Sequence, residues 1–359
     1  DENILGLPMD YLATKVGSVF QNPRTQFFNV DVDSEIAFGI ENIAVPPDEL
    51  HQRLEYTLDS LKIRNLQGKN IFELSGGEKQ KIAFASVYAM NPDIFLLDEP
   101  SSNLDGDSIR DLKNYLRILK QQGKTILIAE HRLYYLLDIA DRIVYLADGK
   151  IEKIYTPQEF RSLSGATRKH MGLRTTDIQD VHPISYQRTF LRPILTVKDV
   201  SLFYKKHPVL EHISLQASKG DIIGVVGPNG AGKTTFLRTL CGLHKEFTGC
   251  FYWREQPQKE NERLKRSYMV MQDVNYELFA DSVEAECSFG IQGSSPELVE
   301  KNLDELGLLT VRDRHPNTLS GGQKQRVAVA VSMICGKEVL VFDEPTSGLD
   351  YDSMEQVSG

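Results

Sequence analysis

Two copies of one sequence pattern constrain the fold of this chain more than any other feature. The pattern begins with LSGG, continues through an apolar helical stretch and reaches DEP, first over residues 74–105 and again over residues 319–350. In both copies the serine of LSGG precedes the aspartate of DEP by 23 residues, and another aspartate follows 7 residues later. The repeat predicts two copies of one domain. A chain of 359 residues also has room for two domains of ordinary size.

Composition narrows the class of protein. The longest apolar stretches are far shorter than the roughly 18 to 20 residues that cross a bilayer, so we expect no membrane-spanning helix. The four cysteines have no CxxC spacing, which argues against a zinc site or a disulfide framework and fits a reducing cytoplasm. A net charge of −9 provides no general attraction to nucleic acid, and we expect no nucleic-acid partner.

The alignment of the copies suggests where the domains begin and end. VFQNPRTQFF and VMQDVNYELF align Gln21 with Gln272, and the second copy then lacks six residues between this glutamine and LSGG, as expected of a surface loop. Between the copies, residues 161–193 carry six Lys or Arg residues, two Asp residues and no clear period. We therefore predict a first domain at 1–160, a linker at 161–193 and a second domain at 194–359.

The stretch GPNGAGKTT, at residues 227–235, occurs only once. It follows DIIGVVG, a β-branched run for which we predict a strand like that predicted for TVKDVSLFY, and it precedes KTTFLRTLCGL, which has helical spacing. This is the context of a phosphate-binding loop, in which glycines turn backbone N–H groups toward the phosphates. A lysine would then neutralise phosphate charge, and a threonine hydroxyl would ligate Mg²⁺. The nucleotide-binding residues expected here are Gly227, Asn229, Gly230, Gly232, Lys233, Thr234 and Thr235, with Thr234 as the Mg²⁺ ligand.

Each DEP follows a short apolar run, which places its aspartate at the end of a buried strand, where bound phosphate lies in α/β folds. Asp98 and Asp343 suit an Mg²⁺ site, and Glu99 and Glu344 suit polarisation of an attacking water. The alternative for either copy is a pair of acids in a turn after a strand. Repetition at the same distance from LSGG weakens that alternative.

The LSGG segments predict helix starts. Ser75 and Ser320 are candidate N-caps, because a helical apolar pattern follows each of them. A helix N-terminus of this kind can accept a phosphate. S-G-G alone is a common turn, so the surrounding motifs decide this interpretation.

In combination, these motifs resemble the nucleotide-binding domain of ATP-binding cassette (ABC) ATPases over nearly the whole chain outside the linker. The resemblance implies an α/β fold with two tandem P-loop NTPase domains that use ATP and Mg²⁺. It identifies Gln21 and Gln272 with the family's glutamine that contacts Mg²⁺ and the attacking water, and His131 with the switch histidine. Tyr204 is similar to the aromatic residue that stacks on adenine, with an ordinary strand tyrosine as the alternative.

The same resemblance implies roles for LSGG and for the aspartate after DEP. In the family, LSGG contacts the γ-phosphate of ATP held by the opposite domain, and two domains pair head to tail. We expect this pairing to occur within the chain. The matching residues are Ser75, Gly76 and Gly77 in the first copy and Ser320, Gly321 and Gly322 in the second, and Asp105 and Asp350 match the family's D-loop aspartate.

Spacing also explains why only one phosphate loop is visible. Lys233 precedes Gln272 by 39 residues, so the corresponding lysine of the first copy would lie before residue 1. His131 follows Glu99 by 32 residues, and its second-copy counterpart would lie after residue 359. We expect both domains to be truncated by the ends of this sequence. The alternative is a first site that has lost its phosphate loop.

The segments after the two glutamines, together with EHRLYYLLDIADRIVYLADGKI, resemble the fused ATPase subunits of energy-coupling factor (ECF) importers. The resemblance implies a peripheral protein at the cytoplasmic face of the membrane, with a transmembrane coupling subunit and a substrate-binding membrane subunit that imports a vitamin or a transition-metal ion. Alternatives are another ABC importer and a soluble tandem ABC protein such as a ribosome-acting translation factor. Candidate docking residues are Phe27, Phe28, Leu278 and Phe279, which could instead form a local core.

Overall fold

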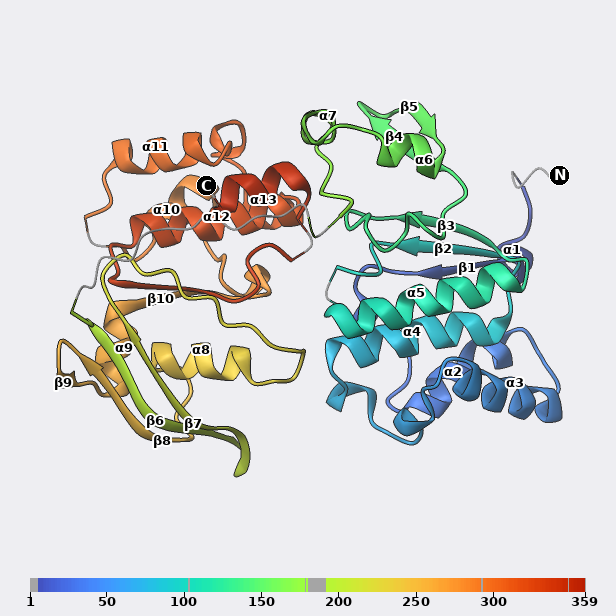
Figure 1. Ribbon diagram of the computed structural model, residues 1–359, viewed down its shortest axis with the longest axis horizontal. Helices are drawn as coiled ribbons and strands as arrows, with labels where there is room; N and C mark the ends of the chain where they lie inside the picture. The colour runs from blue at the N-terminus through green and yellow to red at the C-terminus, as the bar shows by residue number, and fades with distance from the viewer. Residues whose placement is uncertain are drawn as a thin grey trace. The chain divides into compact units, whose positions relative to one another are not determined.

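The chain divides into two compact units, at residues 1–182 and 183–359. The computed structural model (Figure 1) describes residues 6–102, 104–177, 179, 192–291, 293–347 and 349–358. The division falls inside the predicted linker, of which residues 178 and 180–191 lie outside the described residues. No helix in these described ranges is long and apolar enough to cross a membrane.

The first unit is built around a parallel sheet with the strand order β1-β2-β3. Short 3-10 turns lie at Pro23–Thr25, Arg64–Leu66 and Ile71–Glu73. The strands are β1 (Val16–Val19), β2 (Ile94–Asp98) and β3 (Thr125–Ala129), and the helices are α1 (Met9–Lys15), α2 (Val32–Asn42), α3 (Pro47–Ser60), α4 (Gly76–Met90) and α5 (Gly106–Gln121).

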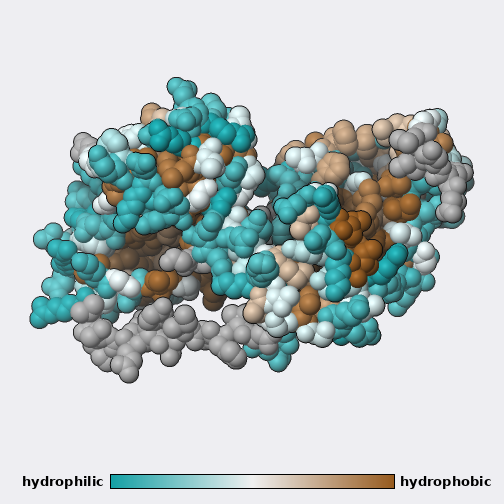
Figure 2. Space-filling model, turned by 90° about the horizontal axis from the view of Figure 1, so that it is seen from above, coloured by the Kyte–Doolittle hydropathy of each residue, from teal (hydrophilic) through white to brown (hydrophobic). Residues whose placement is uncertain are grey.

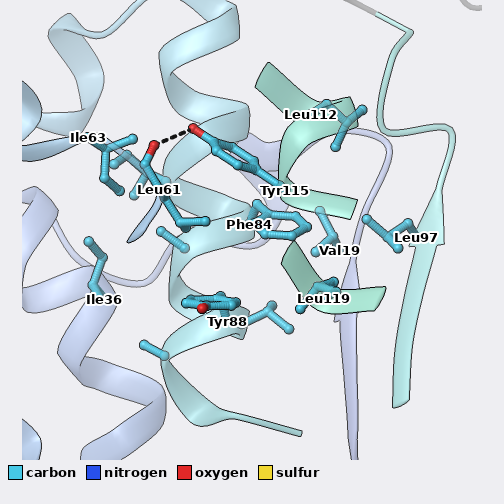
Figure 3. Close-up of a cluster of buried hydrophobic side chains, with 14 of the residues drawn as sticks. Val19, Ile36, Leu61, Ile63, Phe84, Tyr88, Leu97, Leu112, Tyr115 and Leu119 are labelled. Carbon is cyan, nitrogen blue, oxygen red and sulfur yellow. Dashed lines mark hydrogen bonds between the residues drawn. The ribbon is translucent and has the colours of Figure 1, made fainter. Parts of the chain in front are cut away.

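Helix α4 lies at the centre of the core of this unit (Figure 3). The ring of Phe84 stacks on Tyr115 of α5 at a centroid distance of 5.1 Å and on Phe95 of β2 at 6.2 Å. The hydroxyl of Tyr115 donates to the Leu61 carbonyl at 3.0 Å, which satisfies its buried polar atom. Burial of each large apolar side chain contributes about 1.5–3 kcal/mol, so this packing fixes the helix that carries LSGG.

A smaller layer follows β3. It contains the antiparallel strands β4 (Ile143–Ala147) and β5 (Lys150–Tyr155) and the helices α6 (Pro157–Arg161) and α7 (Gly165–His170). Leu163, Met171 and Leu173 pack against the cluster around Phe160. The first part of the predicted linker is therefore packed on the first unit. Its apolar residues are irregularly spaced, which is why they gave no periodic signal.

The second unit contains an antiparallel sheet with the strand order β7-β6-β8-β9. Phe236, from the helix after the phosphate loop, packs with Val197, Leu202 and Phe251 of this sheet. The expected strand TVKDVSLFY lies within β6 and is confirmed. The strands are β6 (Leu195–Tyr204), β7 (His207–Ala217), β8 (Phe247–Trp253) and β9 (Gln256–Pro257), and the helix is α8 (Lys233–Cys241).

The remainder of this unit contains a parallel pair, β10 (Ser267–Val270) and β11 (Val339–Phe342). Helix α12 packs against α10 and α11 around Val327 and Leu303. The helices are α9 (Glu260–Arg266), α10 (Val283–Ser288), α11 (Pro296–Glu305), α12 (Gly321–Ile334) and α13 (Tyr351–Ser358), with 3-10 turns at Val274–Tyr276, Leu309–Val311 and Pro316–Thr318.

The strand predicted at residues 221–227 is wrong. These residues adopt no regular secondary structure, and Ile222 and Val226 are 98% and 90% exposed. A β-branched run forms a strand only where a neighbour pairs with it, and in the described part of the chain β10 and β11 pair only with each other. The sequence pattern reports the side-chain preference but not the presence of a partner strand.

Hydrophobic residues also reach the surface of both units (Figure 2). Leu127 of β3 is 64% exposed, and alternate residues of the β4–β5 hairpin, such as Leu146 and Ile151, are exposed to a similar extent. One face of this hairpin therefore contributes nothing to the core described above.

Candidate nucleotide-binding and hydrolysis sites

The phosphate loop leads directly into helix α8. Gly230 and Gly232 have φ values of +81° and +89°, which glycine adopts readily and other residues rarely do. A Cβ on Gly232 would lie 2.7 Å from Val209, so a side chain there would also clash. The Lys233 ammonium donates to the carbonyls of Gly227 at 2.9 Å and Pro228 at 3.1 Å. The loop is thus curled around its lysine, as the sequence motif predicts.

Thr234 and Asp343 come together from segments 109 residues apart. The Thr234 hydroxyl donates to Asp343 Oδ2 at 2.8 Å, and Asp343 is only 4% exposed at the end of β11. Two adjacent oxygen donors suit Mg²⁺, which keeps water and phosphate oxygens as its other ligands. Within the described part of the chain, no cluster of three or more His, Cys, Asp or Glu side chains could hold a metal. The donor set therefore fits Mg²⁺ bound together with a nucleotide.

A glutamine–glutamate contact occurs in both units. Gln21 donates to Glu99 at 2.8 Å, and Gln272 donates to Glu344 at 3.0 Å. In the first unit, His131 Nε2 lies 3.1 Å from the other carboxylate oxygen of Glu99. The three side chains follow three neighbouring strands, so the end of the parallel sheet brings together residues that are far apart in the sequence. Asp98, the residue before Glu99, is the last residue of β2.

Both of these glutamates have an unusual backbone. Glu99 has a φ of +40° and Glu344 a φ of +51°, in the left-handed region that costs a non-glycine residue about 1–3 kcal/mol. A turn holds each of them, because Ser102 N donates to the Glu99 carbonyl and Ser347 N to the Glu344 carbonyl, each at 3.1 Å. The repetition of this strained geometry indicates a positional requirement for the carboxylates rather than a packing accident.

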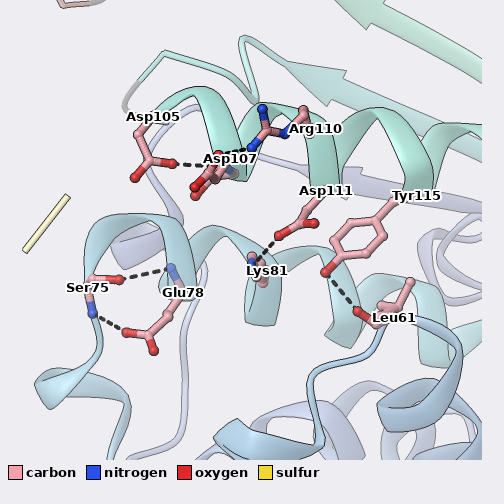
Figure 4. Close-up of polar contacts among 10 residues, drawn as sticks. Leu61, Ser75, Glu78, Lys81, Asp105, Asp107, Arg110, Asp111 and Tyr115 are labelled. Atoms are coloured by element: carbon pink, nitrogen blue, oxygen red, sulfur yellow. Dashed lines mark hydrogen bonds and ion pairs between the residues drawn. The ribbon is translucent and has the colours of Figure 1, made fainter. Parts of the chain in front are cut away.

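The LSGG serines cap their helices, as expected. The Ser75 hydroxyl accepts from the backbone N–H of Glu78, and the Glu78 carboxylate accepts from Ser75 N at 2.9 Å (Figure 4). Ser320 and Gln323 make the same reciprocal pair in the second unit. Helices α4 and α12 therefore begin with their N-terminal N–H groups at LSGG, where they could bind an anion.

The two glycines of each LSGG have different surroundings. A Cβ on Gly77 would meet Ser108 Oγ at 2.6 Å, and one on Gly322 would meet Ser353 Oγ at 3.2 Å. The second glycine of the motif thus allows close helix packing. A Cβ on Gly76 or Gly321 would meet no atom of the described residues within 4 Å apart from its own helix backbone and its chain neighbours. Packing within the unit does not require the first glycine, which leaves space for a group from outside the unit.

The remaining predicted site residues are placed as follows. Asp105 and Asp350 accept the N–H groups of Ser108 at 2.9 Å (Figure 4) and Ser353 at 2.7 Å, and so cap helix starts. Tyr204 ends β6 and is 58% exposed, so its ring is available to a ligand rather than part of the core. Asn229 lies in the turn of the phosphate loop, and Thr235 lies in the first turn of α8.

Sequence reasoning missed a buried glutamate behind each glutamine loop. Glu35 Oε2 accepts from the backbone N–H groups of Phe28 at 3.0 Å and Asn29 at 2.8 Å. Glu286 Oε2 does the same for residues 279 and 280, both at 2.7 Å. The two glutamates match at the same spacing as Gln21 and Gln272, so the alignment of the copies could have found them.

A second missed position differs between the copies. Gln26 accepts from Phe20 N at 3.1 Å and donates to the Ala83 carbonyl at 3.2 Å. Its counterpart Glu277 accepts from Met271 N, but its other carboxylate oxygen is buried and has no hydrogen-bond partner among the residues that the structure describes. Burial is the main cause that raises the pKa of Glu277 to about 7, and the charge of Glu286 adds to it. The carboxylate is thus a poor substitute for the amide once it ionises.

We expect Glu277→Gln to stabilise the second unit above neutral pH. A carboxyl with a raised folded-state pKa contributes stability that is complete below its unfolded pKa of 4.5 and is lost as pH rises through about 7. The variant should therefore gain about 1–2 kcal/mol in free energy of unfolding at pH 8–9 and little at pH 5. Urea unfolding across this range measures it, with the exposed Glu300→Gln as the control. A pH-independent gain would contradict the assignment.

Comparison with known proteins identifies the family. Residues 3–102 and 210–347 match the ABC transporter family. The chain belongs to the ABC transporter ATP-binding proteins. A putative ABC transporter ATP-binding protein of Treponema denticola is 51% identical, over 96% of this chain and 72% of the relative. The putative HMP/thiamine import ATP-binding protein YkoD of Bacillus subtilis is 32% identical, over 94% of this chain and 68% of the relative.

The solved structures agree on the fold. The complex of archaeal ribosomal stalk protein aP1 with the ribosome recycling factor aABCE1 matches with a TM-score of 0.61 and 24% identity. The match covers 96% of this chain and 65% of the solved chain, and at this identity it bears on the fold alone. The predicted α/β fold with tandem P-loop NTPase domains is confirmed, and the family is one of ATPases that bind ATP with Mg²⁺.

Proposed function

We propose that this ABC ATP-binding protein powers an ECF-type importer for a vitamin or a transition-metal ion. It would act as a peripheral subunit at the cytoplasmic face of the membrane, with a transmembrane coupling subunit and a substrate-binding membrane subunit. The main support is a hydrogen bond that occurs in both units, from Gln21 to Glu99 and from Gln272 to Glu344. It joins each carboxylate proposed for hydrolysis to a surface loop, so a partner subunit that displaces the loop would also displace the carboxylate. The import role named for the Bacillus subtilis relative supports the vitamin class.

The chemistry follows from the side chains. Lys233 and the N–H groups at the start of α8 would hold the phosphates, while Thr234 and Asp343 would hold Mg²⁺, which stabilises the charge on the transferred phosphoryl group. Glu344 would orient and polarise the attacking water, and Gln272 would fix the direction of its carboxylate. In the first unit Glu99 would act in the same way. His131 would contact the Glu99 carboxylate on the oxygen that Gln21 leaves free.

The signature motifs would complete these sites in a head-to-tail pairing of the two units. Residues 75–77 would face the nucleotide at the Lys233 loop, and residues 320–322 would face the nucleotide of the first copy. The open space at Gly76 and Gly321, at the start of capped helices, supports this role. A γ-phosphate at either helix start would accept hydrogen bonds from backbone N–H groups that have no acceptor within the helix.

The loops after the glutamines supply a candidate docking surface. The side chains of Phe28 and Phe279 are 75% and 72% exposed. Their backbone N–H groups donate to the buried carboxylates of Glu35 and Glu286, which hold the loop in place. Phe27 and Leu278 pack instead against the cores of their units. The exposed aromatic pair is therefore our choice of contact with the coupling subunit, since rigidly held aromatic side chains are common anchors of interfaces.

Co-purification tests both the proposal and this surface. The full-length protein, tagged and extracted from membranes in mild detergent, should retain a small set of polytopic membrane proteins. Phe28→Ser with Phe279→Ser should reduce their recovery at least about tenfold, because two interface anchors are lost. Leu146→Ser is the control, since this side chain is 66% exposed and belongs to the β4–β5 hairpin rather than to a glutamine loop or the segment paired with it. Recovery of ribosomes, or of no membrane protein, would favour a soluble ABC protein instead.

A further inference from the structure

Arg132, the residue after the candidate switch histidine, binds the segment of the first unit that begins at Glu99. Its Nη1 donates to the Leu104 carbonyl at 3.0 Å, and its Nη2 donates to the Ser102 carbonyl at 3.3 Å. Both accepting residues are buried, each with 7% exposure. A guanidinium presents several N–H donors in one plane and can therefore serve two carbonyls at once. Arg132 thus ties the turn after β3 to the segment after β2.

The turn that carries Arg132 is itself held by a carboxylate. Glu130 Oε1 accepts from the backbone N–H groups of His131 at 2.8 Å and Arg132 at 3.0 Å. The other oxygen, Oε2, accepts from the hydroxyl of Tyr135 at 2.7 Å, and Tyr135 is a buried residue of the core. The guanidinium of Arg132 therefore extends from a backbone that is anchored to the core.

The segment that Arg132 binds starts with a strained residue. Glu99 has a φ of +40°, and such a conformation persists only where neighbouring contacts enforce it. Ser102 N donates to the Glu99 carbonyl at 3.1 Å, so Glu99 and Ser102 belong to one turn. Two adjacent side chains hold this turn. His131 contacts the Glu99 carboxylate at 3.1 Å, and Arg132 binds the backbone that follows.

We propose that Arg132 is a positioning residue for ATP hydrolysis in the first unit, which keeps the Glu99 carboxylate in place through the carbonyls of Ser102 and Leu104. This inference rests on the hydrolytic role proposed for Glu99. Without the guanidinium, the two buried carbonyls lose the hydrogen bonds that it donates, and the turn can relax toward an ordinary backbone conformation. Glu99 would then move away from His131. Arg132 donates to the protein backbone rather than to a ligand group, so the loss should affect turnover more than ATP binding.

The test uses the full-length protein with Glu344→Gln, in which we expect turnover at the first site alone. Arg132→Met keeps the length of the side chain and removes its donors. The single-turnover rate should fall about 10- to 100-fold, with the Kd for ATP within about twofold, because a small displacement of a catalytic group has an effect of this size. Arg132→Lys keeps the charge but lacks the planar fork, and should recover only part of the rate. Exposed Arg142→Met is the control and should change neither quantity.

An unaltered rate in Arg132→Met would overturn the proposal, and so would an equal loss of rate and ATP affinity, which indicates a purely structural role. If Arg132→Met fails to fold, Arg132→Lys decides, since a wild-type rate in that variant would show that the fork is not required. Glu99→Gln in the same background separates the two claims. If it leaves hydrolysis unchanged, the proposed role of Glu99 fails. If it abolishes hydrolysis while Arg132→Met does not slow it, only the role of Arg132 fails.

Discussion

Replacement of Lys233 by alanine is expected to lower the affinity of the second unit for Mg·ATP by about 100-fold. The ammonium is the one cationic side chain of the phosphate loop, and a charge-assisted contact with a phosphate contributes about 1.5–3 kcal/mol, equivalent to a ten- to 150-fold change in affinity. The change should leave the fold intact, because the hydrogen bonds that the ammonium makes within the described residues go to two carbonyls of its own loop. Calorimetric titration with Mg·ATP measures the effect.

Lys219→Ala is the matched control for this experiment. Lys219 is exposed, lies before the phosphate loop and contributes to none of the contacts described. Its loss should leave the affinity unchanged. An unaltered affinity in Lys233→Ala would show that nucleotide is held elsewhere, and the assignment of the phosphate loop would then fail.

The second large effect is on hydrolysis rather than binding. In the full-length protein, Glu344→Gln and Glu99→Gln should each slow hydrolysis at their own site by about 10²–10³-fold, because an amide cannot polarise the attacking water as a carboxylate does. Each new amide oxygen can still accept from Gln272 or Gln21, so the Kd for ATP should change by only a few fold. Single-turnover hydrolysis alongside equilibrium binding separates the two quantities.

Glu300→Gln in helix α11 is a suitable control, since this glutamate is exposed and remote in sequence from both sites. A double variant, Glu99→Gln with Glu344→Gln, should abolish turnover altogether. Retention of a wild-type single-turnover rate in either single variant would remove that glutamate from the hydrolytic role. A parallel loss of ATP binding would indicate a structural role instead.

Local sequence signals predicted the ends of helices and strands well. The LSGG serines cap α4 and α12, and Asp98 and Asp343 lie at the carboxyl ends of β2 and β11, as their flanking residues indicated. These features depend on neighbours in the sequence, so one copy of the motif suffices to predict them. The recurrence of the same motif in the second copy supported both predictions.

Features that depend on distant partners were harder to predict. The run at 221–227 has strand-forming residues but no paired neighbour among the described residues. The packing of Leu163 and Met171, on either side of α7, depends on contacts with the cluster around Phe160. Glu35 and Glu286 looked like ordinary helix residues, because their acceptor role appears only when the glutamine loop folds back on them. The positive φ of Glu99 and Glu344 likewise has no sequence signal.

The cross-completion of one site by the other unit is the central claim, and a bulky substitution at Gly76 tests it most directly. In the full-length protein with Glu99→Gln, we expect turnover at the Lys233 site alone, and Gly76→Arg adds a side chain where the first unit has open space. We predict that ATP still binds while hydrolysis falls at least about 100-fold, with Gly165→Arg at the start of α7 as a harmless control. Undiminished hydrolysis in Gly76→Arg would contradict the account.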